Sequence, residues 1–364
     1  MKIAYLTNSL DMGGIETNLC RLTKALSDRG HSVTVCARPG TLTPTILANG
    51  GTVVDLTMRA SSPISILRDI HRLRRVLSQE LDIVHVLSAT AALVLNFAVR
   101  SLPKARRPVV VASLMGIQTS LNEKRQKTRI RAQVTLAGAN LVIVTSPAIG
   151  ELIGELRHSP TRSVWASVVG VENPDPLGRE RVEKVRASLG IRPEDHLVTT
   201  IGRLDSTKCH HLFIEAAEQI LRDRNDVRFA IIGAGPLDQS LRDQIAEADI
   251  TSNVHLLGER RDITELLCAS TVYVRPSILN GFVGITVLEA QSLRIPVISF
   301  DALDVRPAIE HGVSGLLVPP SDVDQLASTI VDLVDDPVRA ESIGDAGYNR
   351  FTSMFSLDAV TENL

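Results

Sequence analysis

An arginine and a lysine five residues apart follow the first apolar run of the C-terminal half. Arg203 and Lys208 come after Leu197–Ile201, which has the length and composition of a buried strand. A forked guanidinium and a compact ammonium can together neutralise a diphosphate, and a departing diphosphate needs such charge stabilisation. Two solvated surface cations would show the same spacing, so the pair by itself indicates only an anion site.

A carboxylate near the start of a helix is the second candidate. A loop passes through Gly281 and Gly284, a helix is expected from about Ile285, and Glu289 lies in its first turns. A carboxylate there can accept hydrogen bonds from both ribose hydroxyls of a nucleotide. The alternative is a residue that only complements the helix dipole.

Two glycine pairs also follow strand-like runs. Gly13 and Gly14 stand at the head of an expected helix, where backbone amides suit a phosphate, although a plain turn explains this pair better on its own. Gly233 and Gly235 lack the third glycine and the acidic residue of a dinucleotide fingerprint. We interpret the second pair as a loop on the ligand side of a sheet and exclude a nicotinamide site.

All these candidates stand at the ends of apolar, β-branched runs that alternate with helical stretches. The expected strands of the first half are Ile3–Thr7, Ser32–Cys36, Thr52–Leu56, Ile83–Leu87, Val109–Ser113 and Leu141–Thr145. Those of the second half are Leu197–Ile201, Arg228–Ile232, Val254–Leu257, Val272–Arg275, Val297–Phe300 and Gly315–Val318. Runs that are apolar on both faces predict parallel sheets covered by helices on each side. We therefore predict an α/β chain of two doubly wound, Rossmann-like domains, whose ligands bind beyond the carboxyl ends of the strands.

Chain-breaking residues mark the expected domain boundary near Val169–Leu177. Gly170, Asn173, Pro174 and Pro176 gather there. We expect the first domain at 1–172 and the second at 173–345. The segment 346–364 is expected to be a terminal helix that crosses back to the first domain.

The composition is that of a soluble globular protein. The 364 residues are 44% hydrophobic and 22% charged, which suits two domains and excludes a disordered chain. No run reaches the roughly 18 uncharged apolar residues that span a bilayer, and no signal segment precedes the first strand. The four cysteines form no C-x-x-C pair, which argues against a disulfide frame or a zinc site. We expect a cytoplasmic protein.

The charge is unevenly divided along the chain. Up to Glu172 there are 21 basic and 11 acidic residues, and beyond it 18 basic and 30 acidic ones. Nine basic residues between Arg100 and Arg131 accompany a single acid, Glu123. One interpretation is a solvated helix face, and the other is attraction to an anionic acceptor or to an anionic membrane surface.

Taken in order, these segments resemble the family 4 glycosyltransferases, retaining enzymes of the GT-B architecture, along nearly the whole chain. The matching segments are Gly13–Thr17, Gly202–Leu204 with Lys208, Gly233–Pro236, and Gly284–Ala290. The resemblance implies that the second domain binds most of the nucleotide-sugar donor and the first domain binds the acceptor. It also implies a transfer that keeps the anomeric configuration and uses neither a metal nor another cofactor.

The resemblance assigns roles to individual residues. It implies that Arg203 and Lys208 are the catalytic pair at the donor diphosphate. The implied donor-binding residues are Gly14, Ser277, Asn280, Gly281, Phe282, Val283, Gly284, Ile285 and Glu289. The nucleotide base is expected near Arg260 and Asp262. His85 and Met115 are candidates on the acceptor side, with a structural role as the alternative for His85.

Three positions depart from the family pattern. The family usually has a glutamate eight residues before the position of Glu289, where this chain has Gly281 with Asn280 beside it. A histidine is common where this chain has Met115, and a glycine usually follows the lysine, where this chain has Cys209. The first two departures concern the donor sugar, so the sugar is unusual, or other residues replace these contacts, or activity is reduced.

The sequence therefore predicts a retaining glycosyltransferase that moves a sugar from a UDP- or GDP-sugar to an acceptor on the basic first domain. A lipid-linked, phosphorylated or secondary-metabolite acceptor fits, with peripheral contact to the inner membrane face as an option and no nucleic-acid partner. One alternative is a non-catalytic nucleotide-sugar-binding partner of another transferase. A sugar-phosphate enzyme of the phosphorylase or epimerase type with the same architecture is the other.

Overall fold

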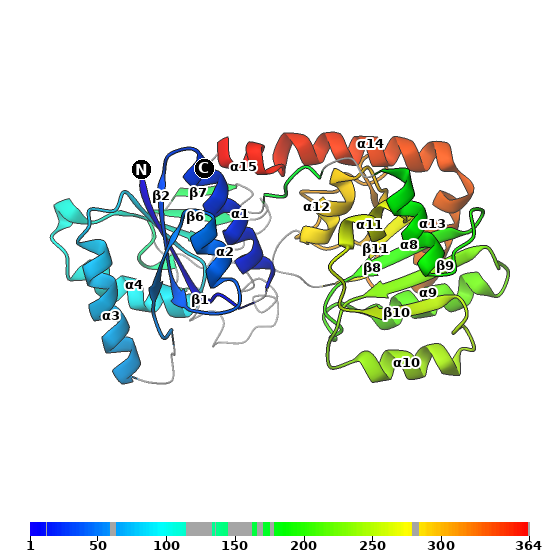
Figure 1. The fold of residues 1–364 in the computed structure, drawn as a ribbon, viewed down its shortest axis with the longest axis horizontal. Helices are drawn as coiled ribbons and strands as arrows, with labels where there is room; N and C mark the ends of the chain where they lie inside the picture. The colour runs from blue at the N-terminus through cyan, green and yellow to red at the C-terminus, as the bar shows by residue number, and fades with distance from the viewer. Residues whose placement is uncertain are drawn as a thin grey trace. The chain divides into compact units, whose positions relative to one another are not determined.

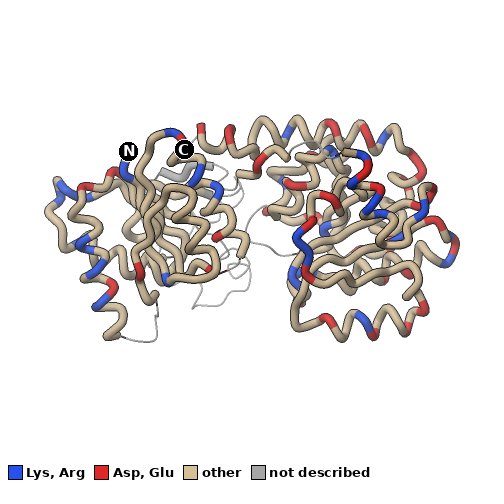
Figure 2. The backbone as a smooth tube through the Cα atoms, in the orientation of Figure 1, with Lys and Arg blue, Asp and Glu red and all other residues tan. Residues whose placement is uncertain are grey.

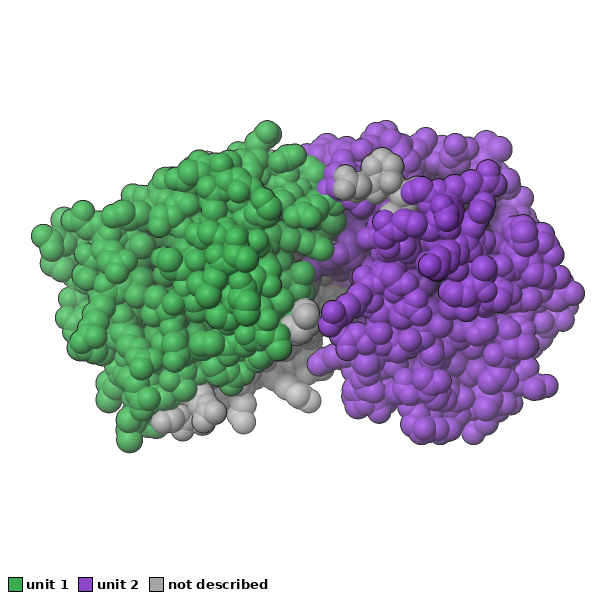
Figure 3. Space-filling view, viewed as in Figure 1, with its two compact units in different colours: residues 1–172, 356–364 green, residues 173–355 purple. Residues whose placement is uncertain are grey.

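The computed structural model contains two parallel β-sheets with helices on their faces (Figure 1). It describes residues 1–11, 13–58, 63–113, 133–134, 136–144, 162–165, 170–174, 178–278 and 284–362. The chain divides into two compact units (Figure 3). Unit 1 comprises Met1–Glu172 and Ser356–Leu364, and unit 2 comprises Asn173–Phe355.

Unit 1 is built on a sheet with the strand order β3-β2-β1-β4-β5-β6-β7 among the described residues. Its strands are β1 (Lys2–Ser9), β2 (Ser32–Arg38), β3 (Thr52–Asp55), β4 (Ile83–Val86), β5 (Val109–Ser113), β6 (Leu141–Val144) and β7 (Arg162–Trp165). Its helices are α1 (Gly14–Asp28), α2 (Thr43–Ala48), α3 (Pro63–Leu77), α4 (Ala89–Arg100), the 3-10 turn η1 (Lys104–Arg106) and α15 (Leu357–Glu362). The order reverses between β1 and β4, which both pair in parallel.

Alternating side chains of β1 explain why helices cover both faces of this sheet. Ala4 and Leu6 are fully buried in a core that includes Leu95 of α4. Ile3 and Tyr5 point to the other face, into a core that includes Leu19 of α1. A strand that is apolar on both faces can be stable only between two helical layers.

Unit 2 repeats this plan with the strand order β10-β9-β8-β11-β12-β13. Its strands are β8 (His196–Ile201), β9 (Val227–Ile232), β10 (Val254–Gly258), β11 (Val272–Arg275), β12 (Val297–Phe300) and β13 (Leu316–Val318). Its helices are α8 (Arg179–Ser188), α9 (His210–Leu221), α10 (Asp238–Glu247), α11 (Ile263–Cys268), α12 (Ile285–Ser292), α13 (Val323–Asp335) and α14 (Pro337–Met354). The order reverses between β8 and β11, and such a switch point is where open α/β sheets bind ligands.

The two doubly wound sheets confirm the predicted fold class, and every expected strand is present. β7 was not predicted, because Arg162–Trp165 is short and half polar. Figure 2 follows the charges along the backbone, including the cations of α3 and of the turn after α4.

The chain leaves unit 2 near Ser356, whereas position 346, where we expected the terminal segment to start, lies inside α14. The backbone N–H of Leu357 donates to the carbonyl of Val171 at 2.9 Å, and Val360 of α15 is buried. The last helix is therefore part of unit 1. None of the helices that the structure describes is long and apolar enough to cross a membrane.

Candidate functional site at the carboxyl edge of the second sheet

The loop after β8 carries Arg203 and Lys208, and Asp205 folds it. The Asp205 carboxylate accepts hydrogen bonds from the backbone N–H of Thr207 at 2.9 Å and from its hydroxyl at 2.6 Å. Arg203 Nε donates to the same carboxylate at 2.6 Å, and its side chain is 74% exposed. Burial raises the pKa of Asp205, but the hydrogen bonds from Thr207 and Arg203 outweigh it and leave the pKa lowered. The Asp205 carboxylate therefore carries its charge at neutral pH and stabilises the turn.

Lys208 lies among charges from three neighbouring loops. Burial lowers the pKa of its ammonium group, and the nearby Arg275 lowers it further, while Asp205 and Asp304 act in the opposite direction. Asp205 and Asp304 follow β8 and β12, and Arg275 ends β11, so the topology of the sheet brings them together. An anion bound here would favour the charged form of Lys208.

Arg275 and Asp304 form a buried ion pair that the sequence analysis did not identify. Each side chain is 3% exposed, and Arg275 Nη2 donates to Asp304 Oδ2 at 2.7 Å. Arg275 Nη1 also donates to the carbonyl of Ser277 and the hydroxyl of Ser299, both at 3.2 Å. Burial raises the pKa of Asp304 to about 6, against the influence of Arg275. The available signal was an arginine at the end of an apolar run.

The start of α12 lies against this arginine. A Cβ at Gly284, which precedes α12, would be 3.5 Å from Arg275 Nε, and this Nε has no hydrogen-bond partner among the described residues. Ser277 is buried on the preceding loop. Glu289 is half-buried on α12, and Ile285 is the first residue of this helix. The first backbone amides of α12 and an unsatisfied arginine nitrogen therefore occur together, which suits an anion.

Gly233 and Gly235 support the Arg203 loop from the neighbouring strand end. Gly233 has φ +145°, and a Cβ there would overlap the carbonyl oxygen of Gly202. A Cβ at Gly235 would overlap the backbone of Leu204, whose N–H donates to the carbonyl of Ala234 at 3.0 Å. The sequence led us to interpret this pair as a loop on the ligand side of the sheet. The structure gives a further reason for glycine at both positions, because a side chain there would overlap the neighbouring backbone.

Arg260 and Asp262 follow β10 and bind each other. Arg260 Nε donates to Asp262 Oδ1 at 2.8 Å, and this bond lowers the pKa of Asp262. Both side chains are about one third exposed, at 33% and 32%. The pair is accessible at the same edge of the sheet, two strands from β8.

The candidates of unit 1 lie around the ends of β1 and β4. Gly14 begins α1, and a Cβ at the preceding Gly13 would overlap the Glu16 carboxylate, so this carboxylate turns back over the start of the helix. His85 is 4% exposed, and its Nε2 lies 2.7 Å from the hydroxyl of Ser113. Burial lowers the pKa of His85 to about 4. These contacts favour the structural role of His85.

Unit 2 thus collects part of the predicted site at the carboxyl ends of β8 and β11. The residues found there are Arg203, Lys208, Ser277, Gly284, Ile285 and Glu289. Met115, Asn280, Gly281, Phe282 and Val283 lie outside the described residues. Within the described part of the chain, no three histidine, cysteine or acidic side chains are grouped as metal ligands.

Two doubly wound domains, each with a reversal in its strand order, form the GT-B architecture. Comparison with family models agrees. "Glycosyl transferases group 1" matches residues 181–350, and "Glycosyl transferase 4-like domain" matches residues 13–165. The chain belongs to the family 4 glycosyltransferases.

Its relatives include enzymes with different donors. A GDP-mannose-dependent monoacylated alpha-(1-6)-phosphatidylinositol monomannoside mannosyltransferase of Corynebacterium glutamicum is 30% identical over 56% of this chain and 55% of its own length. The UDP-Gal:alpha-D-GlcNAc-diphosphoundecaprenol alpha-1,3-galactosyltransferase of Escherichia coli is 26% identical over 76% of this chain and 73% of its own. The chain spans about half the length of the curated relatives it matches first.

The fold is shared with solved structures over its whole length. Anabaena HepE, solved in complex with UDP and glucose, has a TM-score of 0.85 at 22% identity, covering 100% of this chain and 98% of its own. This similarity extends through both units.

Proposed function

We propose that this protein transfers a sugar from a UDP- or GDP-sugar to an acceptor, and that unit 2 binds the donor diphosphate. The observation that carries the proposal is the placement of Arg203 and Lys208 at the carboxyl end of β8, beside the strand-order switch. A diphosphate leaving there would meet both cations and the amides at the start of α12. Glu289, on the same helix, would bind the ribose.

The negative charge of the departing diphosphate determines the role proposed for each residue. As the bond between the anomeric carbon and the β-phosphate oxygen breaks, negative charge grows on the diphosphate, and the two cations stabilise it. Asp205 fixes the Arg203 loop, while the Arg275–Asp304 pair fixes the loop that carries Ser277. We propose that these cations make a metal ion unnecessary and that the anomeric configuration is kept. A chelator that abolishes transfer would contradict the first point, and NMR of the product's anomeric proton tests the second.

The proposal for the acceptor is based on the charge of residues 1–172. Residues 1–172 carry 21 basic and 11 acidic side chains, which favours an anionic acceptor. The two relatives named above are transferases whose names include phosphatidylinositol and diphosphoundecaprenol. We propose a phosphorylated or lipid-linked acceptor, with peripheral contact to an anionic membrane.

Replacing Lys208 tests the proposal. We expect Lys208→Ala to lower transfer by about 100-fold or more, because the loss of one charge-stabilising donor costs about 3 kcal/mol in the transition state. Transfer is measured as nucleotide release from UDP-glucose, UDP-galactose and GDP-mannose with a membrane-lipid extract as acceptor. Lys184→Ala, on the exposed face of α8, is the matched control with the same change of charge.

The outcomes separate the two functions. Full turnover by Lys208→Ala would contradict the catalytic role. The alternative, a non-catalytic nucleotide-sugar-binding partner, is motivated by Gly281, where the family usually has a glutamate. It predicts that UDP or GDP raises the melting temperature of the wild-type protein while no donor is consumed.

A further inference from the structure

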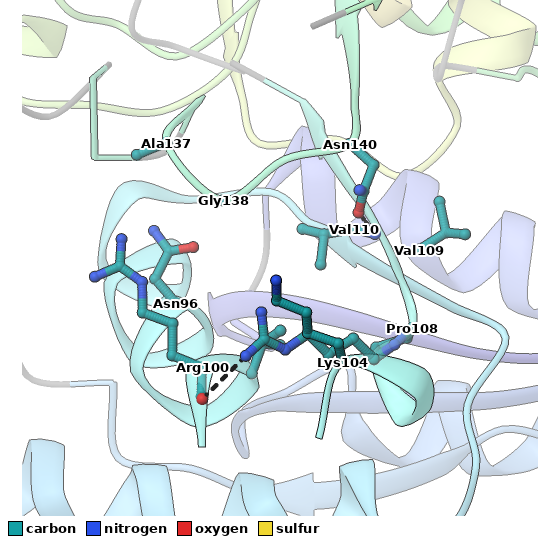
Figure 4. Close-up of a pocket in the computed structure, with 11 residues that line it drawn as sticks. Asn96, Arg100, Lys104, Pro108, Val109, Val110, Ala137, Gly138 and Asn140 are labelled. Atoms are coloured by element: carbon teal, nitrogen blue, oxygen red, sulfur yellow. Dashed lines mark hydrogen bonds between the residues drawn. The ribbon is translucent and has the colours of Figure 1, made fainter. Parts of the chain in front are cut away.

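We propose that unit 1 has a second anion site, a pocket that binds a phosphoryl group away from the strand ends where transfer is expected. The pocket has a volume of about 440 Å³ (Figure 4). Arg100, Lys104 and Arg107 line it together with the amides Asn96 and Asn140. Beyond their share of the basic charge of residues 1–172, these residues have no role in the family resemblance or in the proposed function, and the inference does not rest on the donor site.

The pocket lies at the amino edge of the first sheet. Asn96 and Arg100 belong to the end of α4, and Lys104 begins η1. Val109, the first residue of β5, and Asn140, which immediately precedes β6, form the opposite wall. Ser113 ends β5 four residues further on, which is about 13 Å away at 3.3 Å per residue. The pocket is therefore separate from the carboxyl edge, where α/β sheets bind their substrates.

Among the described residues, nothing compensates the positive charge of the pocket. No acidic side chain lines it, and Arg100, Lys104 and Arg107 form no ion pair with an acidic residue in the described parts of the chain. Three cations around one hollow repel one another, and a bound anion removes this repulsion. Figure 4 shows Asn96, Arg100 and Lys104 around the hollow, facing Val110 and Asn140.

Hydrogen bonds hold the walls in place without an anion. Arg107 donates from Nε to the carbonyl of Leu102 and from Nη2 to that of Arg100, both at 3.2 Å. Asn140 Oδ1 accepts from the backbone N–H of Val110 at 2.8 Å, and Asn96 Nδ2 donates to the carbonyl of Val134 at 2.8 Å. The guanidinium of Arg107 is thus fixed, whereas Arg100 and Lys104 are exposed and can close on a ligand.

This chemistry selects a phosphoryl group. A phosphate monoester carries nearly two negative charges and three acceptor oxygens, which arginine and lysine side chains can share. None of the described residues that line the pocket is aromatic, so none of them stacks on a nucleotide base. The phosphate can belong to a lipid headgroup or to a soluble molecule. Both present the same group, and the experiment distinguishes them.

Acetylation of Lys104 by an amine-reactive reagent, followed residue by residue with mass spectrometry, tests the proposal. Bound phosphate should slow the acetylation of Lys104. The reduction is roughly threefold when the phosphate concentration is twice the Kd, because only the unbound protein reacts. One arm compares inorganic phosphate with chloride at equal ionic strength. The other compares vesicles of phosphatidylcholine and phosphatidic acid with vesicles of phosphatidylcholine alone. Lys184 of α8, exposed in unit 2, is the internal reference.

Two variants tie the protection to the pocket. Arg100→Gln should abolish it, whereas Arg74→Gln, with the same charge change on the exposed face of α3, should keep it. Shielding by inorganic phosphate indicates a soluble ligand, and shielding by anionic vesicles alone indicates a lipid headgroup. The proposal is overturned if neither arm shields Lys104, or if shielding persists in Arg100→Gln. Thermal melting of both variants verifies that they are folded.

Discussion

Cys209 combines a buried side chain with an unfavourable backbone conformation. It precedes α9 with φ 53° and ψ 35°, the left-handed conformation that costs an L-residue about 1–2 kcal/mol. The family pattern has glycine after the lysine, which adopts this conformation without that cost. The thiol is buried, so packing compensates in part for the strained backbone.

Two substitutions at Cys209 separate these effects. Cys209→Gly and Cys209→Ala both remove the thiol, but only glycine relieves the backbone. We expect the glycine variant to be more stable than the alanine variant by about 1 kcal/mol, the reverse of their order inside a helix. Urea unfolding of both proteins measures the difference. An alanine variant of equal or greater stability would show that the backbone is not strained.

Local sequence pattern located Arg203 and Lys208 but not the groups around them. The two residues are close in sequence and follow a recognisable strand, whereas their role is a prediction from the family resemblance. Arg275 and Asp304 are 29 positions apart, and only the pairing of β11 with β12 brings them together. The partner of a buried charge at the end of an apolar run can be identified only when the order of the strands is known.

Loop packing at the carboxyl edge of the second sheet depends on glycine. Gly233→Ala would force a Cβ into the carbonyl of Gly202, whereas a Cβ at Gly190, also at positive φ, meets nothing within 4 Å. Gly190→Ala is therefore the control for adding a Cβ at a positive φ where no atom is in contact. We expect Gly233→Ala to cost about 2 kcal/mol more than this control, the range for overpacking a core.

The same variant should affect the site, because the displaced backbone adjoins Arg203. We expect the rise in melting temperature that UDP or GDP causes to shrink in Gly233→Ala and to remain in Gly190→Ala. Equal stability of the two variants would mean that the loop after β8 shifts without cost.

At the scale of elements, the strands were predictable because both faces of a doubly wound sheet must be apolar. The pattern identified every strand except β7, whose four residues include Arg162 and Ser163. The end of unit 2 was misplaced because α14 is continuous across position 346, through Gly344 and Gly347.

Each unit contains a buried histidine that resists protonation. Burial lowers the pKa of His85 in unit 1 to about 4, and burial together with Lys208 lowers that of His210 in unit 2 to about 4. In the unfolded chain a histidine binds its proton near pH 6.5. Between pH 6.5 and 4 these histidines thus bind more protons in the unfolded state than in the folded state, and their contribution to the stability of each unit falls as the pH falls.

Unit 1 offers a direct measurement of this effect. Trp165, the sole tryptophan of the sequence, lies in β7, so its fluorescence follows the unfolding of this unit. We expect the free energy of unfolding to fall by about 2 kcal/mol from the His85 contribution between pH 7 and 4.5. His85→Asn should show a correspondingly smaller fall. The control, His71→Asn on the exposed face of α3, should behave as the wild type, and an unchanged pH dependence in His85→Asn would contradict the prediction.

The return of the chain to unit 1 has a consequence for synthesis on the ribosome. Residues 356–362 are translated after every residue of unit 2, yet Val360 and the bond from Leu357 to Val171 belong to unit 1. Unit 1 therefore cannot complete its fold before unit 2 has been translated, although most of it is encoded first. During elongation the nascent first unit exposes the surface of α1 that α15 later covers, and this surface is available to chaperones until translation passes residue 362.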